Sequence, residues 1–332
     1  MAKAGEGKMK RFSNVVLALA LLSTAASAVI ADDYPSRPIT MIVPFAAGGP
    51  TDVIGRLLAQ SMSQTLGQNV IVEDVTGAAG TVGVARVAHA PPDGYTLSLG
   101  HWSTHVANGA IYNLPYDLLN DLSPVTVLPS NPMLIVSRNS LPAKDLKELV
   151  AWIKEHPNTT MGTAGVGSGS HIAGVYFEKL TDAHVQFVPY RGTDPALLDL
   201  MAGRIDVMFD QVSEASQKLQ DGRIRPYAVT AKTRLPSLPD IPTVDEVGLP
   251  GLYINIWYGL WAPQGTPADI IAKLDKAAVA AMAEPTVKKR FAELGLDMPP
   301  LDQQTPQALS ALQKGEIDKW WPIIKAAGIH AE

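Results

Sequence analysis

The sequence has 332 residues, a net charge of −5 and no cysteine. A chain of this length buries enough apolar surface to fold without disulfide bonds, so the absence of cysteine excludes a disulfide-stapled scaffold. The acidic balance argues against nucleic acid or an anionic membrane surface as a partner.

The first 31 residues have the pattern of a secretory signal peptide. Basic residues precede an apolar stretch at 15–22 that is too short to span a membrane, and small-residue cleavage sites end at Ala28 and Ala31. Removing residues 1–31 takes away four basic residues and one acidic residue, which moves the net charge from −5 to −8. We therefore expect an exported protein, in which a small anion would need a local binding site.

The segment Ile39–Asp52 joins an apolar strand to a glycine turn and then to the start of a helix. Its first five residues are typical of a buried strand, and the proline that follows cannot donate to a sheet. Gly48 and Gly49 permit a tight turn, and Thr51 or Asp52 is placed to cap a helix that continues to the next glycine. Because the first turn of a helix leaves amide groups free, the segment predicts an oxyanion site.

Strand and helix patterns then alternate along the chain. The first set continues with strands at 70–75 and 95–99, a glycine loop at 77–80 and a helix at 81–89. The second set has strands at 133–137, 159–163, 185–188, 205–209 and 227–230, with helices at 145–154, 171–180, 195–202 and after 213. Such alternation predicts an α/β fold with a mainly parallel sheet between layers of helices.

Two α/β sets predict two lobes with a ligand cleft between them. Proline-rich segments at Leu128–Pro132 and Pro236–Pro250 are interpreted as the crossings between the lobes. We therefore assign residues 32–130 and 253–332 to a discontinuous first lobe that anchors the ligand, and residues 131–252 to the second.

The C-terminal part of the chain has the spacing of two amphipathic helices, at 267–282 and 305–327. We expect both to pack on the first lobe. Trp320 and Trp321 are interpreted as core anchors of the second of these helices.

Short motifs follow one another in a specific order from Tyr34 to the final helices. They are Pro44-Phe45 with Gly48-Gly49 and Asp52, Gly77-Ala78-Ala79-Gly80, Pro92–Leu97, Ser103-Thr104-His105 with Asn108, Leu114–Asp117, Pro189–Gly192, Gly203–Asp206, Ile241–Thr243 and Trp261–Pro263. In this order and spacing they resemble the tripartite tricarboxylate transporter solute receptors, the Bug proteins.

The resemblance implies a periplasmic binding protein of the Venus flytrap type, with two lobes, a hinge and an interlobe cleft. Such a receptor captures a small organic mono- or dicarboxylate and delivers it to the inner-membrane permease subunits of a tripartite tricarboxylate transporter. It implies a monomer that binds no nucleic acid, cofactor or metal and catalyses no reaction.

In relatives, backbone amides of two glycine loops in the first lobe hold the proximal carboxylate, and groups of the second lobe meet the distal end of the ligand. Carried over to this chain, the implied ligand-binding residues are Phe45, Ala47, Gly48, Gly49, Asp52, Gly77, Ala78, Ala79, Gly80, Thr81, Thr104 and His105 in the first lobe, and Ser168, Ser170, His171, Tyr190, Arg191, Gly192 and Asp210 in the second. Trp102 is a further candidate that the family pattern does not supply.

The pair His101-Trp102 departs from the small residues that commonly precede the Ser-Thr-His segment in the family. An indole there could line the cleft for an aromatic acid such as terephthalate, or it could pack in the core. Both interpretations stay open at the level of the sequence.

An enzyme is the alternative from another class, because Ser168, Ser170 and His171 are close together in the sequence. Neither serine stands in the Gly-x-Ser-x-Gly pattern of a hydrolase, and Ser170 is interpreted as a helix cap. His101 and His105 lack a nearby acidic residue to complete a metal site and are interpreted as polar cleft or surface groups, with His105 the better candidate for a ligand neighbour. A carboxylate receptor for a sensor kinase is a third hypothesis that the sequence does not separate from transport.

Overall fold

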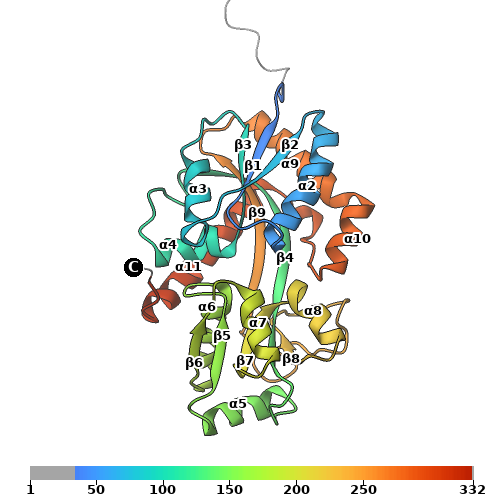
Figure 1. Ribbon diagram of the computed structural model, residues 1–332. Coiled ribbons are helices and arrows are strands. Elements are labelled where there is room, and N and C mark those ends of the chain that lie inside the picture. The colour runs from blue at the N-terminus through green and yellow to red at the C-terminus, as the bar shows by residue number, and fades with distance from the viewer. Residues whose placement is uncertain (1–33, 331–332) are drawn as a thin grey trace, which may run out of the picture. The chain divides into compact units, whose positions relative to one another are not determined.

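Strands and helices alternate as expected in the structure, a computed structural model that describes residues 34–330 (Figure 1). The predicted signal peptide at 1–31 lies outside the described residues. From Arg37 onward the described residues belong to one compact unit. None of the described helices is both long and apolar enough to cross a membrane.

The first group of elements precedes the central strands. It contains β1 (Ile39–Val43), α2 (Pro50–Leu66), β2 (Val70–Asp74), η1 (Ala78–Gly80), α3 (Thr81–Ala88), β3 (Thr96–His101), η2 (Ser103–Ala107) and α4 (Asn108–Ile111). Strand β1 pairs in parallel with both β2 and β3. Its apolar residues are completely buried, as expected for a parallel strand that is covered on both faces.

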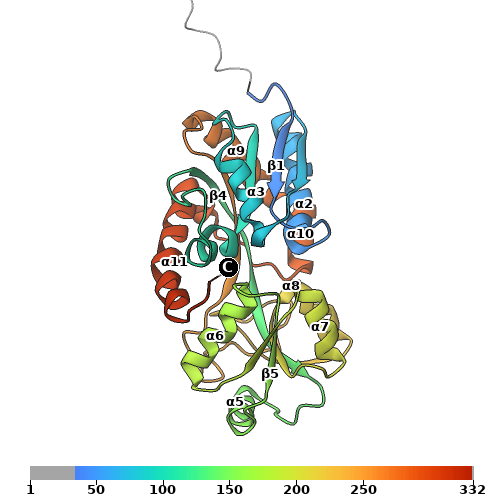
Figure 2. The same ribbon diagram turned by 60° about the vertical axis from the view of Figure 1, so that its left-hand side comes forward.

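The second group lies along the chain between the central strands β4 (Leu122–Arg138) and β9 (Asn255–Pro263). It contains α5 (Leu146–Glu155), β5 (Thr160–Thr163), α6 (Gly169–Thr181), β6 (Gln186–Pro189), α7 (Thr193–Met201), β7 (Val207–Gln211), α8 (Val212–Gln220) and β8 (Ile224–Val229). Figure 2 shows α6 and α7 on opposite sides of β5. Each helix therefore buries its apolar face against the same strands.

The chain ends with α9 (Ala268–Ala283), α10 (Pro285–Glu293), η3 (Leu301–Gln303) and α11 (Pro306–Ala326). The sequence did not predict α10. Helix α11 packs against β4, η2 and α4. Trp320 is almost completely buried, and the indole N–H of Trp321 donates to the carbonyl of Val106 over 2.8 Å, so both tryptophans anchor α11 as expected.

The strands follow the order β2-β1-β3-β9-β4-β7-β5-β6, and β8 pairs with β4. The prediction of a mainly parallel sheet is wrong for its centre. Strands β1, β2 and β3 are parallel, as are β5, β6 and β7, but β4 runs antiparallel to β7, β8 and β9. The outer strands are joined by helical crossovers, which give parallel pairs, whereas β4 and β9 carry the chain between the two groups in opposite directions.

Strand β4 passes without a break through Leu128–Pro132, the segment that the sequence assigned to the first crossing. Pro124, Pro129 and Pro132 all lie within the strand. The register against β9 shifts between Pro124 and Thr126 and again between Val127 and Ser130. Such bulges let a strand contain prolines that cannot donate to the ladder.

The second crossing is made by β9 rather than by Pro236–Pro250. That proline-rich segment docks beside β8, where the N–H of Val229 donates to the carbonyl of Pro242 and the N–H of Val244 donates to the carbonyl of Val229. Strands β4 and β9 are paired from Leu122 to Pro132, so the two crossings lie side by side (Figure 1). The lobe boundaries at 130/131 and 252/253 stay a prediction.

Candidate functional site

A cavity of about 680 Å³ lies where several strand-to-helix connections meet. Its walls come from the loop before α2, the loop before α6, the start of α7 and the end of β7 with the first turn of α8. Residues from η1, β3, η2, α4, β4 and β9 complete it. The lining residues are Phe45–Thr51, Ala79, His101, Ser103, Asn108, Met133, Ala164, Val166–Ser170, Arg191–Pro195, Phe209–Gln211, Glu214, Ile256 and Tyr258.

Half of the residues expected at the ligand line this cavity. They are Phe45, Ala47, Gly48, Gly49, Ala79, Ser168, Ser170, Arg191, Gly192 and Asp210. The other ten lie outside its lining, and the following paragraphs give the contacts that most of them make instead. They are Asp52, Gly77, Ala78, Gly80, Thr81, Trp102, Thr104, His105, His171 and Tyr190.

The loop before α2 is held by Asp52. The Asp52 carboxylate accepts from the N–H of Gly48 over 2.7 Å and forms an ion pair with Arg56. Burial acts to raise the pKa of Asp52, but the hydrogen bonds from Arg56 and Gly48 outweigh it and the pKa is lowered. The N-cap residue of α2 is Gly49, which has no side chain to cap the helix, so the predicted capping role of Thr51 or Asp52 is wrong. Asp52 instead holds the loop before α2 through its hydrogen bond from Gly48.

The second glycine loop reaches the cavity through Ala79 alone. Ala78 and Ala79 have φ angles of 43° and 51°, in the left-handed region that alanine rarely adopts. The side-chain amide of Asn108 donates to the carbonyl of Ala79 over 2.9 Å and helps to hold this conformation. Such strain persists only where the surroundings enforce it, and it gathers at functional sites.

The end of β3 supplies an aromatic wall. His101 stacks on Phe45 with ring centroids 4.5 Å apart, and its ring meets Tyr258 edge to face at 5.6 Å. Its Nδ1 accepts from the N–H of Ser103 over 3.0 Å. Burial lowers the pKa of His101 to about 3, so the ring is neutral at physiological pH and carries its hydrogen on Nε2.

Trp102, Thr104 and His105 belong to the core. Trp102 meets Trp320 edge to face at 5.3 Å and is 1% exposed. His105 stacks on Trp261 at 3.7 Å and is completely buried. The sequence ranked His105 above His101 as a ligand neighbour, and the structure places them the other way round, because His101 ends a strand and the π-helical turn η2 rotates His105 inward.

The serines before α6 hold the loop in place. Ser168 caps the helix by accepting from the N–H of His171 over 3.3 Å, and Ser170 Oγ accepts from the N–H of Ala164 over 2.9 Å. The cap is thus Ser168 rather than the predicted Ser170. The His171 ring accepts at Nδ1 from the N–H of Gly167. Its Nδ1 is therefore not available as the base that would activate a serine.

Tyr190 turns away from the cavity, and its hydroxyl donates to Asp199 over 2.8 Å. The next residues, Arg191 and Gly192, line the cavity, and Gly192 is the N-cap of α7. Gln211 is the N-cap of α8. Neither N-cap residue makes a side-chain capping bond, although the Asn131 side chain accepts from the N–H of Ser213 in the first turn of α8 over 3.4 Å.

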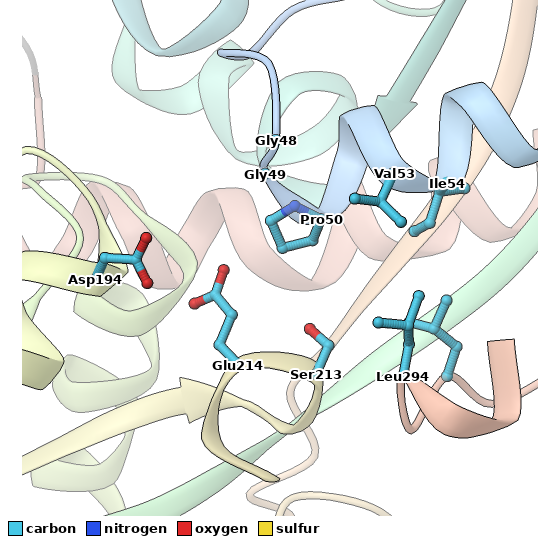
Figure 3. A pocket seen from close by; sticks show the side chains of 10 residues that line it. Gly48, Gly49, Pro50, Val53, Ile54, Asp194, Ser213, Glu214 and Leu294 are labelled. Carbon is cyan, nitrogen blue, oxygen red and sulfur yellow. The ribbon is translucent and has the colours of Figure 1, made fainter. Parts of the chain in front are cut away.

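A smaller pocket of about 180 Å³ shares part of the cavity wall (Figure 3). Gly49 and Pro50 at the start of α2 face the carboxylates of Asp194 and Glu214. Glu214 and Tyr258 line the cavity but were not predicted from the sequence as site residues. The spacing of four residues between Asp210 and Glu214 was a usable signal for Glu214, since both then lie at one helix start, whereas Tyr258 lies on a strand that the sequence analysis did not predict.

A family model described as tripartite tricarboxylate transporter family receptor matches residues 54–329. The UPF0065 protein of the TAR-I ttuE-ttuC' intergenic region of Agrobacterium vitis is 43% identical over 319 residues, which are 96% of this chain and 92% of that protein. Protein BugT of Bordetella pertussis is 33% identical over 306 residues, 91% of this chain and 93% of that protein.

Solved structures are similar over nearly their whole length. Periplasmic binding protein BugD is 38% identical with a TM-score of 0.80, covering 90% of this chain and 100% of that chain. MatC from Rhodopseudomonas palustris with bound malate is 40% identical with a TM-score of 0.80, covering 88% and 100%. Another R. palustris protein, solved with adipate, is 32% identical with a TM-score of 0.82, covering 90% and 100%. The fold is therefore that of the periplasmic binding proteins, as predicted.

Proposed function

The chain belongs to the tripartite tricarboxylate transporter receptor family, and from this premise we propose that it captures a small organic carboxylate in the periplasm and delivers it to the permease subunits of such a transporter. Family members are periplasmic solute-binding receptors. The similar R. palustris proteins were solved with malate and with adipate, which are both dicarboxylates.

One observation carries the proposal. Helices α2, α7 and α8 all begin at the wall of the same cavity, and none of their N-cap residues makes a side-chain capping bond. In α8 the N–H of Ser213 already donates to the side-chain oxygen of Asn131 over 3.4 Å. The first turn of each leaves N–H groups without intrahelical partners, at the positive end of the helix dipole. A carboxylate accepting such bonds gains about 1.5–3 kcal/mol from each without needing an arginine. The loop before α2 is the proposed anchor, because Asp52 fixes it without taking the amides of the helix itself.

Carboxylates should therefore stabilise the folded protein against heat. A ligand that binds only the native state adds about 2.7 kcal/mol at a hundredfold excess over its dissociation constant. We expect the melting temperature to rise in a screen of aliphatic and aromatic mono- and dicarboxylates, with neutral sugars as the control. A screen in which sugars raise it and carboxylates do not would contradict the proposal.

The cavity wall also bears on the choice between receptor and enzyme. Ser168 and Ser170 hold backbone amides, and His171 Nδ1 accepts from Gly167, so the three are arranged as loop supports. Ser168→Ala and Ser170→Ala should each weaken carboxylate binding by about 1 kcal/mol, typical of one neutral hydrogen bond. No ester or amide substrate should be turned over by the unaltered protein. Hydrolysis by the unaltered protein that disappears in either variant would show that the protein is an enzyme and would contradict the receptor proposal.

A further inference from the structure

His101 presents a hydrogen-bond donor to the cavity of about 680 Å³. The ring is held through its other nitrogen, because Nδ1 accepts from the N–H of Ser103 over 3.0 Å. A backbone N–H can only donate, so Nδ1 carries no proton and the hydrogen of the neutral ring lies on Nε2. The amide of Ser103 therefore fixes both the charge of the ring and the position of its donor.

The Nε2 donor has no acceptor within the described protein. The hydrogen bonds of His101 among residues 34–330 are made by its backbone and by Nδ1. No described carboxylate lies within 4.0 Å of its ring nitrogens. The residue is only 9% exposed, yet its Nε2 is open to the cavity, whereas Nε2 of His105 is enclosed in the core. A ligand that excludes solvent here must bring an acceptor or leave this donor unpaired.

Two aromatic rings hold the imidazole in this orientation. It stacks on Phe45 with an interplanar angle of 14° and ring centroids 4.5 Å apart. Tyr258 meets it edge to face at 5.6 Å. Turning the ring would break both contacts and the bond from Ser103. The donor is therefore already placed before a ligand arrives, which reduces the ordering cost of binding.

The contacts of His101 connect two of the helix starts at the cavity. On one side, Phe45 belongs to the loop before α2. On the other side, the hydroxyl of Tyr258 donates to the side-chain oxygen of Gln211, the N-cap residue of α8, over 3.4 Å. Helix starts are positive and suit the charged ends of a ligand. The neutral N–H between them suits an uncharged oxygen on the body of the ligand.

We infer that His101 donates from Nε2 to a hydroxyl or carbonyl oxygen that the ligand carries between its ends, and so selects substituted carboxylates over unsubstituted ones of the same length. The inference rests on the proposed function, since it requires a carboxylate to be held at a helix start. A site that hydrogen-bonds a substituent rejects the analogue without it, because the buried group of the site is then left unpaired. A methyl group in place of the hydroxyl fills similar space and cannot accept.

The test is isothermal titration of the intact protein with two matched sets of ligands. One set is succinate, 2-methylsuccinate and malate, and the other is glutarate, 2-methylglutarate and 2-hydroxyglutarate, with both enantiomers of each chiral ligand. We expect the hydroxy ligand of the better-fitting set to bind at least tenfold more tightly than the methyl ligand, in one of its enantiomers.

Two variants of His101 separate its two ring nitrogens. The side-chain oxygen of His101→Asn can replace Nδ1 and still accept from Ser103, but its amide is too short to reach the position of Nε2. The amide of His101→Gln reaches that position with an N–H group. We expect His101→Asn to reduce the preference for hydroxy over methyl about tenfold, by weakening the hydroxy ligand, and His101→Gln to keep most of it. His89→Asn, at an exposed histidine that ends α3, should leave the preference unchanged.

The outcomes distinguish this inference from the proposed function. Equal binding of hydroxy and methyl ligands, or a preference that His101→Asn retains, would overturn the inference and leave the carboxylate receptor intact. The same follows if none of the six ligands binds but another carboxylate of the wider screen does. No binding of any carboxylate would overturn both.

Melting curves of the free variants show whether they fold. If His101→Asn does not, the unaltered protein still decides the question by NMR with isotope-labelled histidine. The Nε2–H signal of His101 should shift when the hydroxy ligand binds and should not shift in the same way with the methyl ligand. Identical spectra with the two ligands would overturn the inference.

Discussion

The indole of Trp102 contributes to stability through its burial. It is 1% exposed, and its edge contact with Trp320 links η2 to α11. Trp102→Ala should therefore lower the free energy of unfolding by about 3–5 kcal/mol, because it removes a large buried side chain and leaves a cavity. Chemical denaturation measures this loss. Trp152→Ala, at a partly exposed position on α5, is the control and should cost less.

This assignment also bears on aromatic ligands. If Trp102 lined the cleft, its loss would weaken an aromatic dicarboxylate more than an aliphatic one. From its position in the core we expect equal changes for the two classes in whatever protein remains folded. A loss of affinity for the aromatic ligand alone would show that Trp102 lines the cleft.

His101 and His105 couple stability to pH. Burial lowers the pKa of both rings below the ordinary value of 6.5, to about 3 for His101. The unfolded chain therefore binds more protons than the folded one between these values. Stability is unaffected above the unfolded pKa and falls as the pH drops below 6.5, by at most about 1.4 kcal/mol per pH unit for each ring.

The difference between His101→Gln and the unaltered protein isolates one of these rings. The free energy of unfolding of the variant should fall less steeply between pH 6.5 and pH 4, as measured by urea denaturation at several pH values. The burial of Asp210 acts in the opposite direction, since its raised pKa favours the folded state as the pH falls, but it is common to both proteins. His330→Gln, at an exposed position, should keep the slope of the unaltered protein.

At the scale of elements, the loop before α2 offers the sharpest test of the carboxylate anchor. Gly48 has a φ of +86°, so a side chain there strains the turn. Gly49 has a φ of −75°, and an added Cβ would meet only the carbonyl of Ala46 at 3.5 Å. Gly49→Val should therefore fold while its side chain obstructs the approach to the helix start.

We expect Gly49→Val to lose the melting shift that a carboxylate gives to the unaltered protein. Gly315→Val is the control, because Gly315 lies in α11 with open space around its Cβ position and does not line the cavity. Unchanged carboxylate affinity in a folded Gly49→Val protein would mean that the carboxylate is held at another helix start.

The elements that could be predicted are those with a local signal. The turn of Gly48 and Gly49 and the helix after it follow from residues adjacent in the chain, and the structure has them within a residue or two. Strand β9 was not predicted, and the strand predicted at 133–137 covers only the end of β4. The extent of both strands depends on their pairing with each other, which residues adjacent in the chain do not indicate. The cavity lining divides in the same way, because its glycine loops were predicted from adjacent residues, whereas Tyr258 reaches the cavity only through the pairing of β9 with distant strands.

At the scale of the whole molecule, β4 and β9 are the two described strands that join the groups of elements on either side of the cavity. Contacts also cross between the groups away from these strands, for example Tyr176 on α6, whose ring meets Trp320 on α11 edge to face at 5.3 Å. A ligand held by α2 on one side and by α7 and α8 on the other would add to such contacts. If the predicted lobes and hinge exist, ligand binding should bring the two groups of elements closer together.

Spin labels on two introduced cysteines can measure whether the two groups of elements approach each other, because the chain has no cysteine of its own. Val82 on α3 and Leu198 on α7 are suitable sites, at 50% and 60% exposed and outside the cavity lining. If the groups close about β4 and β9, a saturating carboxylate should shift the distance distribution between the labels to shorter and narrower values. Labels at Val82 and Leu119, which both precede β4, should keep their separation. Identical distributions with and without a ligand that demonstrably binds would mean that the two groups move as one body and that the predicted hinge is wrong.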